Sequence, residues 1–182
     1  MRKAIALMIV ATGLAAGAAS AKETPALFDT LSRRASVKVY VETFADAVKP
    51  TDLKVDTTAL KGKIEKALTG RKSIKFEVVN DKSQADIAIE GKILEVGWQD
   101  TDPVDMIVGL GGVAMDAAMS EHYCVLVSEV TVNDVKAGAC LYKDNVRATV
   151  TTNDMKKETF GDFIYDDFAK VLMKEAFGKK KS

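Results

Sequence analysis

Apolar and polar residues alternate along several stretches of this chain, with the period expected of strands that bury one face. The longest such stretch is residues 84–98. One face would carry an apolar set, namely Ile87, Ile89, Gly91 and Ile93. The other face would carry Ala88, Glu90, Lys92, Leu94, Val96 and Trp98. The pattern predicts a long central strand, in which Gly91 and Gly97 mark a bulge or a close approach by a helix or another backbone.

Four further stretches are predicted as strands. Residues 37–42 and 74–78 alternate in the same way, and the other two are residues 123–132 and 139–150. Because only a short polar segment, residues 133–138, separates the last two, we expect them to form a hairpin.

Two other stretches repeat their apolar residues at helical spacing. In the first, Asp56 is a predicted N-cap, Gly70 is a predicted C-cap, and the buried face would carry Leu60, Ile64 and Leu68. In the second, the apolar stripe comprises Phe160, Ile164, Phe168, Leu172 and Ala176, widened by Phe163 and Val171. Both patterns predict amphipathic helices.

The predicted order is therefore β-α-β-β-insert-β-β-α. Two amphipathic helices over one face of a mixed sheet of about five strands would form an α+β fold, an α/β sandwich with one core. We expect a single globular domain over residues 36–178, a lead-in over 22–35 with a short helix around Leu27, and a basic tail over 179–182.

The first 21 residues have the features of a secretory signal peptide. Arg2 and Lys3 precede the apolar run 4–16, and residues 19–21 read Ala-Ser-Ala, a pattern that signal peptidase accepts. We predict cleavage after Ala21 and a periplasmic location. A retained membrane anchor is the alternative, but the run is shorter than the roughly 20 apolar residues of a spanning helix. No cysteine lies near Ala21, so we expect no lipid anchor.

Charge balance gives no reason to expect a polyanionic partner. Loss of Arg2 and Lys3 lowers the basic count from 26 to 24, against 26 acidic residues. A chain so nearly neutral has no long-range attraction to nucleic acid or to an anionic membrane. We therefore expect no nucleic acid partner, and no transmembrane segment after cleavage.

Candidate catalytic and metal-binding residues are few. His122 is the only histidine, and no Gly-x-Ser-x-Gly motif accompanies it. His122 and Cys124 would share one face of a strand, yet zinc needs four ligands and no Cys-x-x-Cys or His-x-x-x-His motif supplies the others. We expect neither an enzyme nor a bound cofactor or metal, with a small hydrolase using His122 as an alternative.

The two cysteines can be placed by the predicted hairpin. If residues 134–138 form its loop, Cys140 faces Val132 and Cys124 faces Ala148. The thiols would then lie about 27 Å apart, at ~3.4 Å per residue. A disulfide needs Cα atoms within about 7 Å. We predict two small buried thiols, with an intramolecular disulfide as the alternative.

Two loops carry residues that bind phosphate or calcium in other proteins. Residues 109–112 read Gly-Leu-Gly-Gly but lack the Gly-Lys-Ser/Thr ending of a P-loop. Asp100, Asp102 and Asp105 surround Pro103, but their spacing does not match an EF-hand. We predict a site at neither loop.

Residues 106–119 form an apolar stretch rich in Gly, Ala and Met, with Asp116 as its only charge. Its 14 residues are too few to span a bilayer as a helix, which takes about 20. Burial within the domain is one interpretation, and a flap facing a lipid or a partner protein is the other. The candidate contact residues are Trp98, Met106, Ile107, Leu110, Met115 and Met119.

Three segments together resemble a set of bacterial envelope domains. Residues 39–44 are an opening strand that ends in Phe44, and residues 84–93 place Ala-Asp before a strand containing an apolar-x-Gly step. Residues 130–141 are similar to a hairpin with an Asp-x-x-Thr-Gly turn, although Ala137 stands in place of the threonine.

The set includes the curli-secretion lipoproteins, the lipoprotein activators of penicillin-binding proteins, the amino-terminal domain of the Tol translocation protein and uncharacterised exported families. The resemblance implies an α/β sandwich used for protein–protein contact in envelope assembly. It brings no catalytic residues with it. The predicted function is thus a non-catalytic periplasmic protein that binds an unknown envelope partner, and the alternative is a carrier of a lipid or small apolar molecule beneath residues 106–119.

Overall fold

The computed structural model describes residues 27–47, 53–101, 121–154 and 156–179. These form six strands in one sheet: β1 (Val37–Val41), β2 (Ala45–Asp46), β3 (Phe76–Val78), β4 (Ile87–Thr101), β5 (Glu121–Asp134) and β6 (Cys140–Thr152). The helices are α1 (Leu27–Leu31), α2 (Thr57–Thr69) and α4 (Phe160–Glu175), with the 3-10 turns η1 (Lys82–Gln84) and η2 (Lys157–Thr159). The predicted α+β fold class is confirmed.

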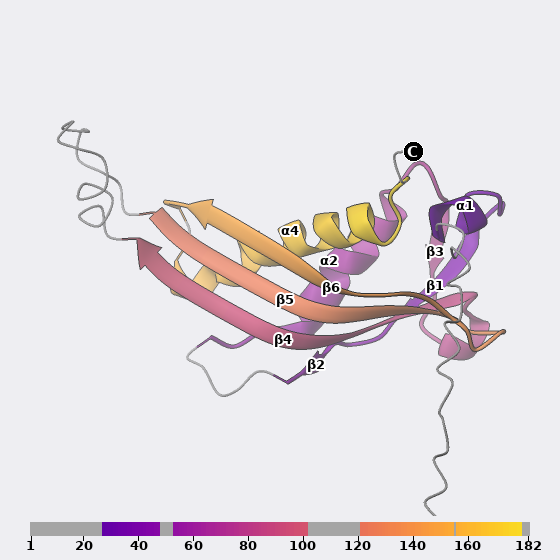
Figure 1. Ribbon diagram of the computed structural model, residues 1–182, viewed down its shortest axis with the longest axis horizontal. Helices are drawn as coiled ribbons and strands as arrows, with labels where there is room; N and C mark the ends of the chain where they lie inside the picture. Colours follow the sequence, from indigo (N-terminus) through magenta and orange to yellow (C-terminus); the bar gives the residue numbers. More distant parts are fainter. Residues whose placement is uncertain (1–26, 48–52, 102–120, 155, 180–182) are drawn as a thin grey trace, which may run out of the picture.

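The sheet is mixed, and its long strands dominate the shape of the molecule (Figure 1). The strand order is β3-β1-β4-β5-β6, and the short β2 lies beside β4. β1 is parallel to β3 and β4, whereas β4, β5 and β6 are successively antiparallel. The sequence predicted every strand except β2, because two residues are too few to show an alternation.

Helix α2 begins and packs as its sequence predicts. The Asp56 carboxylate accepts hydrogen bonds from the backbone N–H groups of Thr58 and Ala59, at 3.0 and 2.9 Å. These bonds satisfy two of the N–H groups that a helix leaves unpaired at its start. The predicted stripe is fully buried, and its members are Leu60, Ile64 and Leu68.

Helix α4 completes a single core with α2 on the same side of the sheet (Figure 1). All five residues of its predicted stripe are buried. The Phe168 ring meets the Phe44 ring edge-on, with centroids 6.1 Å apart, so the helix is packed directly against the segment that follows β1. Leu27 and Leu31 of α1 belong to the same core, so part of the predicted lead-in packs with the domain.

A β-bulge corrects the predicted faces of the central strand. The ladder between β4 and β5 shifts at Leu94, between Ile93 and Glu95. One extra residue reverses the alternation of side chains beyond it. Val96 is therefore buried, and Trp98 packs against the core from the same face as Ile93. The sequence had assigned both to the opposite face and had placed the strand start three residues too early.

The hairpin of β5 and β6 forms, but the predicted register is wrong by two residues. Asn133 lies opposite Cys140, and the ladder shifts between Val132 and Asn133. The turn contributes one residue of this shift and the irregularity contributes the other, so Cys124 lies opposite Val150. Both thiols are free, and Cys124 is buried as predicted. Cys140 is exposed, against the prediction, because it lies at the start of an edge strand.

Candidate functional site

One end of the sheet is tied together by Asp86. Its carboxylate accepts hydrogen bonds from the Lys38 backbone N–H and from the Lys136 ammonium, both at 3.0 Å. Its backbone N–H donates to the Lys38 carbonyl at 2.8 Å, and its carbonyl accepts from Val135 N–H at 3.0 Å. These bonds, the Lys38 N–H foremost, lower the pKa of Asp86 below its usual value. Asp86 therefore joins β1, β4 and the β5–β6 turn.

The turn between β5 and β6 depends on Asp134 and Gly138. The Asp134 carboxylate accepts from the backbone N–H groups of Lys136 and Ala137, at 3.0 and 2.8 Å. Gly138 has φ +63°, a conformation that costs glycine little and other residues more. Only the N–H of Ala137 takes part, so replacing the expected threonine with alanine removes none of these bonds. We call Asp86, Lys38, Asp134, Lys136 and Gly138 the clasp.

Gly91 and Phe44, two residues of the family resemblance, contact each other. A Cβ atom on Gly91 would overlap carbon atoms of the Phe44 ring, which packs against the strand and is buried. The apolar-x-Gly step and the phenylalanine that ends the opening strand are thus two halves of one contact. The sequence predicted a bulge or a close approach by a helix or another backbone at Gly91, and the group that approaches is instead an aromatic side chain.

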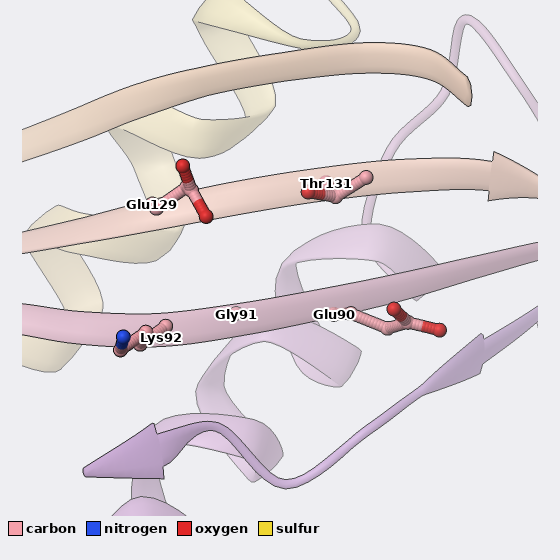
Figure 2. Close-up of a pocket in the computed structure, with 5 residues that line it drawn as sticks. All are labelled: Glu90, Gly91, Lys92, Glu129 and Thr131. Carbon is pink, nitrogen blue, oxygen red and sulfur yellow. The ribbon is translucent and has the colours of Figure 1, made fainter. Parts of the chain in front are cut away.

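A polar depression lies over Gly91 on the face of the sheet opposite the helices. Figure 2 shows its lining, in which Glu90 and Lys92 come from β4 and Glu129 and Thr131 from β5. Its volume is about 210 Å³, below the ~300–1,000 Å³ of small-molecule pockets.

Both carboxylates of this depression are already paired. The Lys82 ammonium lies 2.7 Å from Glu90, and the Lys143 ammonium lies 3.2 Å from Glu129. Because an antiparallel sheet often has one hydrated face, these residues form an ordinary polar surface, and nothing in their arrangement favours a ligand.

The other end of the sheet holds Trp98. Its ring stacks on His122 with centroids 5.2 Å apart and an interplanar angle of 24°. Trp98 lies opposite Cys124, whose burial raises the pKa of its thiol to about 11. A thiol with so high a pKa is a poor nucleophile near neutral pH. Within the described residues, no three His, Cys, Asp or Glu side chains are placed to hold a metal ion.

This end also has two open strand edges. β4 pairs with β1 at residues 87–89 and with β2 at residues 92–93, and in the described part of the chain β5 alone pairs with it farther on. Likewise, the described residues give β6 a neighbour on one side only, β5. We call residues 94–101 of β4, with their single neighbouring strand, the open β4 edge.

Leu94 lies at the start of the open β4 edge. The residue is 42% exposed, and among the described residues it is the one large hydrophobic residue that is exposed. The sequence did not indicate that Leu94 is exposed and Val96 buried, because simple alternation placed both residues on the same face of the strand. The bulge leaves Leu94 exposed and turns Val96 into the core.

Of the six contact residues predicted from the sequence, the structure describes only Trp98, which caps one end of the core. The others lie outside the described residues and are Met106, Ile107, Leu110, Met115 and Met119. The loops around Pro103 and residues 109–112 also lie outside them. No described helix is long and apolar enough to cross a membrane.

Comparison with known proteins gives structural likenesses only. No family model matches the chain, and no curated protein matches it. A hypothetical protein from Chlamydia trachomatis is 12% identical with a TM-score of 0.48, covering 78% of this chain and 96% of its own. The PelC dodecamer from Paraburkholderia phytofirmans is 17% identical with a TM-score of 0.45, covering 75% and 86%.

A minor lipoprotein from Acinetobacter baumannii is 14% identical with a TM-score of 0.41, covering 76% of this chain and 91% of its own. Similarity at this level carries no information about function. It does not identify the curli-secretion, penicillin-binding-protein activator or Tol families, so those resemblances stay predictions. The word lipoprotein in that name describes the Acinetobacter protein alone.

Proposed function

We propose that this is an exported, non-catalytic protein of the bacterial envelope that binds a partner protein along the open β4 edge. Export is supported by the signal-like pattern of residues 1–21. The observation that carries the binding proposal is the open β4 edge itself, which begins at the exposed Leu94.

An open strand edge binds an extended segment by adding it as a further strand. Its backbone N–H and C=O groups supply the affinity, and the side chains beside it supply the specificity. Soluble proteins normally protect such an edge with charges, proline or a covering segment. The bulge at Leu94 and the charges on Glu95 and Asp100 flank residues 96–99 of the open β4 edge, which carry no charge and no proline. This composition favours a bound strand.

Crosslinking in cells tests the proposal. A photo-reactive amino acid in place of Leu94 should give one discrete crosslinked product with an envelope protein. The matched control carries the same group in place of Lys170, an exposed residue of α4, and should give none. Diffuse products from Leu94, or the same product from both sites, would overturn the proposal.

A pair of substitutions tests whether the contact matters for binding. Leu94→Asp should abolish recovery of the crosslinked partner with the purified protein, because a carboxylate would be desolvated in the contact. Lys170→Asp introduces the same residue at an exposed site of α4 and should leave recovery unchanged. Loss of the partner in both variants would contradict a role for the open β4 edge.

Export is checked separately by sequencing the amino terminus of the protein recovered from the periplasm. We expect it to begin at Lys22. Recovery only from the cytoplasm, with Met1 retained, would refute the export part of the proposal.

A further inference from the structure

In the described part of the chain β6 has no neighbouring strand on its outer side, and this edge is divided into two unlike halves. Residues 140–147 contain an irregularity in the pairing and three charges, on Lys143, Asp144 and Arg147. Lysine, charge and bulges are features that keep edge strands from pairing. Residues 148–152 read Ala-Thr-Val-Thr-Thr and have no charge, no proline and no bulge. Only the second half is suited to pair with another strand, and its β-branched residues favour an extended backbone.

We propose that residues 148–152 pair antiparallel with the same residues of a second copy of this chain, about a two-fold axis at Val150. This surface lies on the opposite side of the long strands from the open β4 edge. The dimer therefore does not depend on the proposed function, and a protein partner and a second copy can be bound at the same time.

The side chains of this segment are self-complementary in that register. Directly opposed residues of an antiparallel pair share one face of the sheet. Thr149 would lie opposite Thr151 of the second copy on the exposed face. Val150 would lie opposite its own counterpart on the core face, where it is already half-buried. Threonine pairs and apolar pairs are both stabilising across strands.

The charges outside the paired segment favour the same register. Pairing about Val150 brings Arg147 to the level of Asn153 and Asp154 of the second copy, so unlike charges approach. Pairing about Val146 would engage all of β6. It would also gather Lys143 and Arg147 of both copies along one seam, where like charges repel. The shorter register is therefore preferred.

The short seam predicts a concentration-dependent dimer. Stable interfaces bury about 1,600 Å², and one short strand from each copy provides less. Sedimentation equilibrium over a range of loading concentrations up to about 100 μM, a range that detects a micromolar Kd, should show monomer and twice the monomer mass. Reductant is included so that the exposed Cys140 forms no crosslink.

Charge substitutions at two exposed threonines test the register. The double variant Thr149→Lys with Thr151→Lys places like charges opposite each other and should sediment as a monomer. Thr149→Lys with Thr151→Glu places Lys opposite Glu in both directions and should sediment as a dimer. The control Asn145→Lys adds the same charge on the same face outside the paired segment and should not change the dimer.

A disulfide test adds a readout that needs no charge. In chains carrying Cys140→Ser, Thr149→Cys mixed with Thr151→Cys should oxidise to a heterodimer faster than either variant alone, because only opposed residues come within disulfide range. A monomeric wild-type protein at every concentration would overturn the proposal. A dimer that survives the double lysine change, or equal oxidation in all mixtures, would also overturn it. Crosslinking from Leu94 should persist in the lysine variant, which separates this proposal from the proposed function.

Discussion

The two ends of the sheet use their polar groups in opposite ways. At the clasp, Asp86 forms four hydrogen bonds that join β1, β4 and the β5–β6 turn. At the other end, β4 and β6 each have a backbone edge with no neighbouring strand in the described residues. The clasp uses side-chain and backbone hydrogen bonds to join three segments of the fold, whereas the open β4 edge has no neighbouring strand in the described residues.

This difference explains what a motif can reveal. The residues that carried the resemblance are Phe44, Ala85, Asp86, Gly91, Asp134 and Gly138, and all of them lie in the clasp or in the core beside it. Their chemistry is used to hold the fold, so a resemblance based on them predicts a fold. A strand edge that binds does so mainly through its backbone, which every sequence has, so the binding proposed for the open β4 edge would leave no motif.

The largest expected effect is a contrast between two glycines of β4. Gly91→Ala should lower the free energy of unfolding by about 2–3 kcal/mol, because its Cβ would displace the Phe44 ring within a packed core. Urea denaturation measures the change. Gly97→Ala is the matched control, in which the new Cβ would meet only the Val125 methyl, at 2.8 Å.

For Gly97→Ala we expect a net change below about 1 kcal/mol, because relief of glycine's backbone entropy offsets the contact. Equal losses of unfolding free energy at the two glycines would show that the strand beside Val125 is packed as tightly as the core beside the clasp.

The second effect is the stability contributed by Asp86. Asp86→Ala should cost about 2 kcal/mol at pH 7, since it removes a carboxylate that accepts a backbone N–H in a partly buried site. Because the folded pKa of Asp86 is lowered, this stability is present above the unfolded pKa of about 3.9 and is lost as pH falls through the folded value.

Thermal melts of wild type and variant between pH 7 and pH 2 should therefore converge at the acid end. A difference in stability that stays constant with pH would mean that the Asp86 carboxylate is not what joins the strands.

A smaller effect on stability is expected at the open β4 edge. Leu94→Asp should change the free energy of unfolding by less than about 0.5 kcal/mol, because Leu94 is exposed and packs little. The same variant is expected to lose its partner, so binding and stability separate at this residue. A large loss of stability would show that Leu94 belongs to the core.

The reactivity of the two cysteine thiols compares the two ends of the sheet without any substitution. In the native protein at pH 8, alkylation should label Cys140, which is exposed at the turn, and leave Cys124 unlabelled, because burial raises the pKa of Cys124 to about 11. After unfolding without reductant, intact mass should show two labels. A single label after unfolding would require one thiol to be bonded or modified.

Local pattern was sufficient for much of the fold. The stripes of α2 and α4, the Asp56 cap and the core residues Ile87, Ile89 and Ile93 are where the sequence predicts them. Such features are set within a few turns or strand residues, because burial of one face requires a fixed period. Asp86 and the Asp134 turn stood out only through the family resemblance, and their hydrogen-bond partners were not predicted.

Only the tertiary structure decided which residues form the open β4 edge. A single bulged residue, Leu94, decides whether Trp98 faces the core or solvent, and nothing in the local alternation announces it. Which edges remain open is decided by where β1 and β2 stop pairing with β4 and by β6 being last in the sheet. Sequence determined which residues are apolar and how they repeat. Pairing between distant strands decided which of them, and which backbone groups, are left for a partner, because register and strand order are long-range properties.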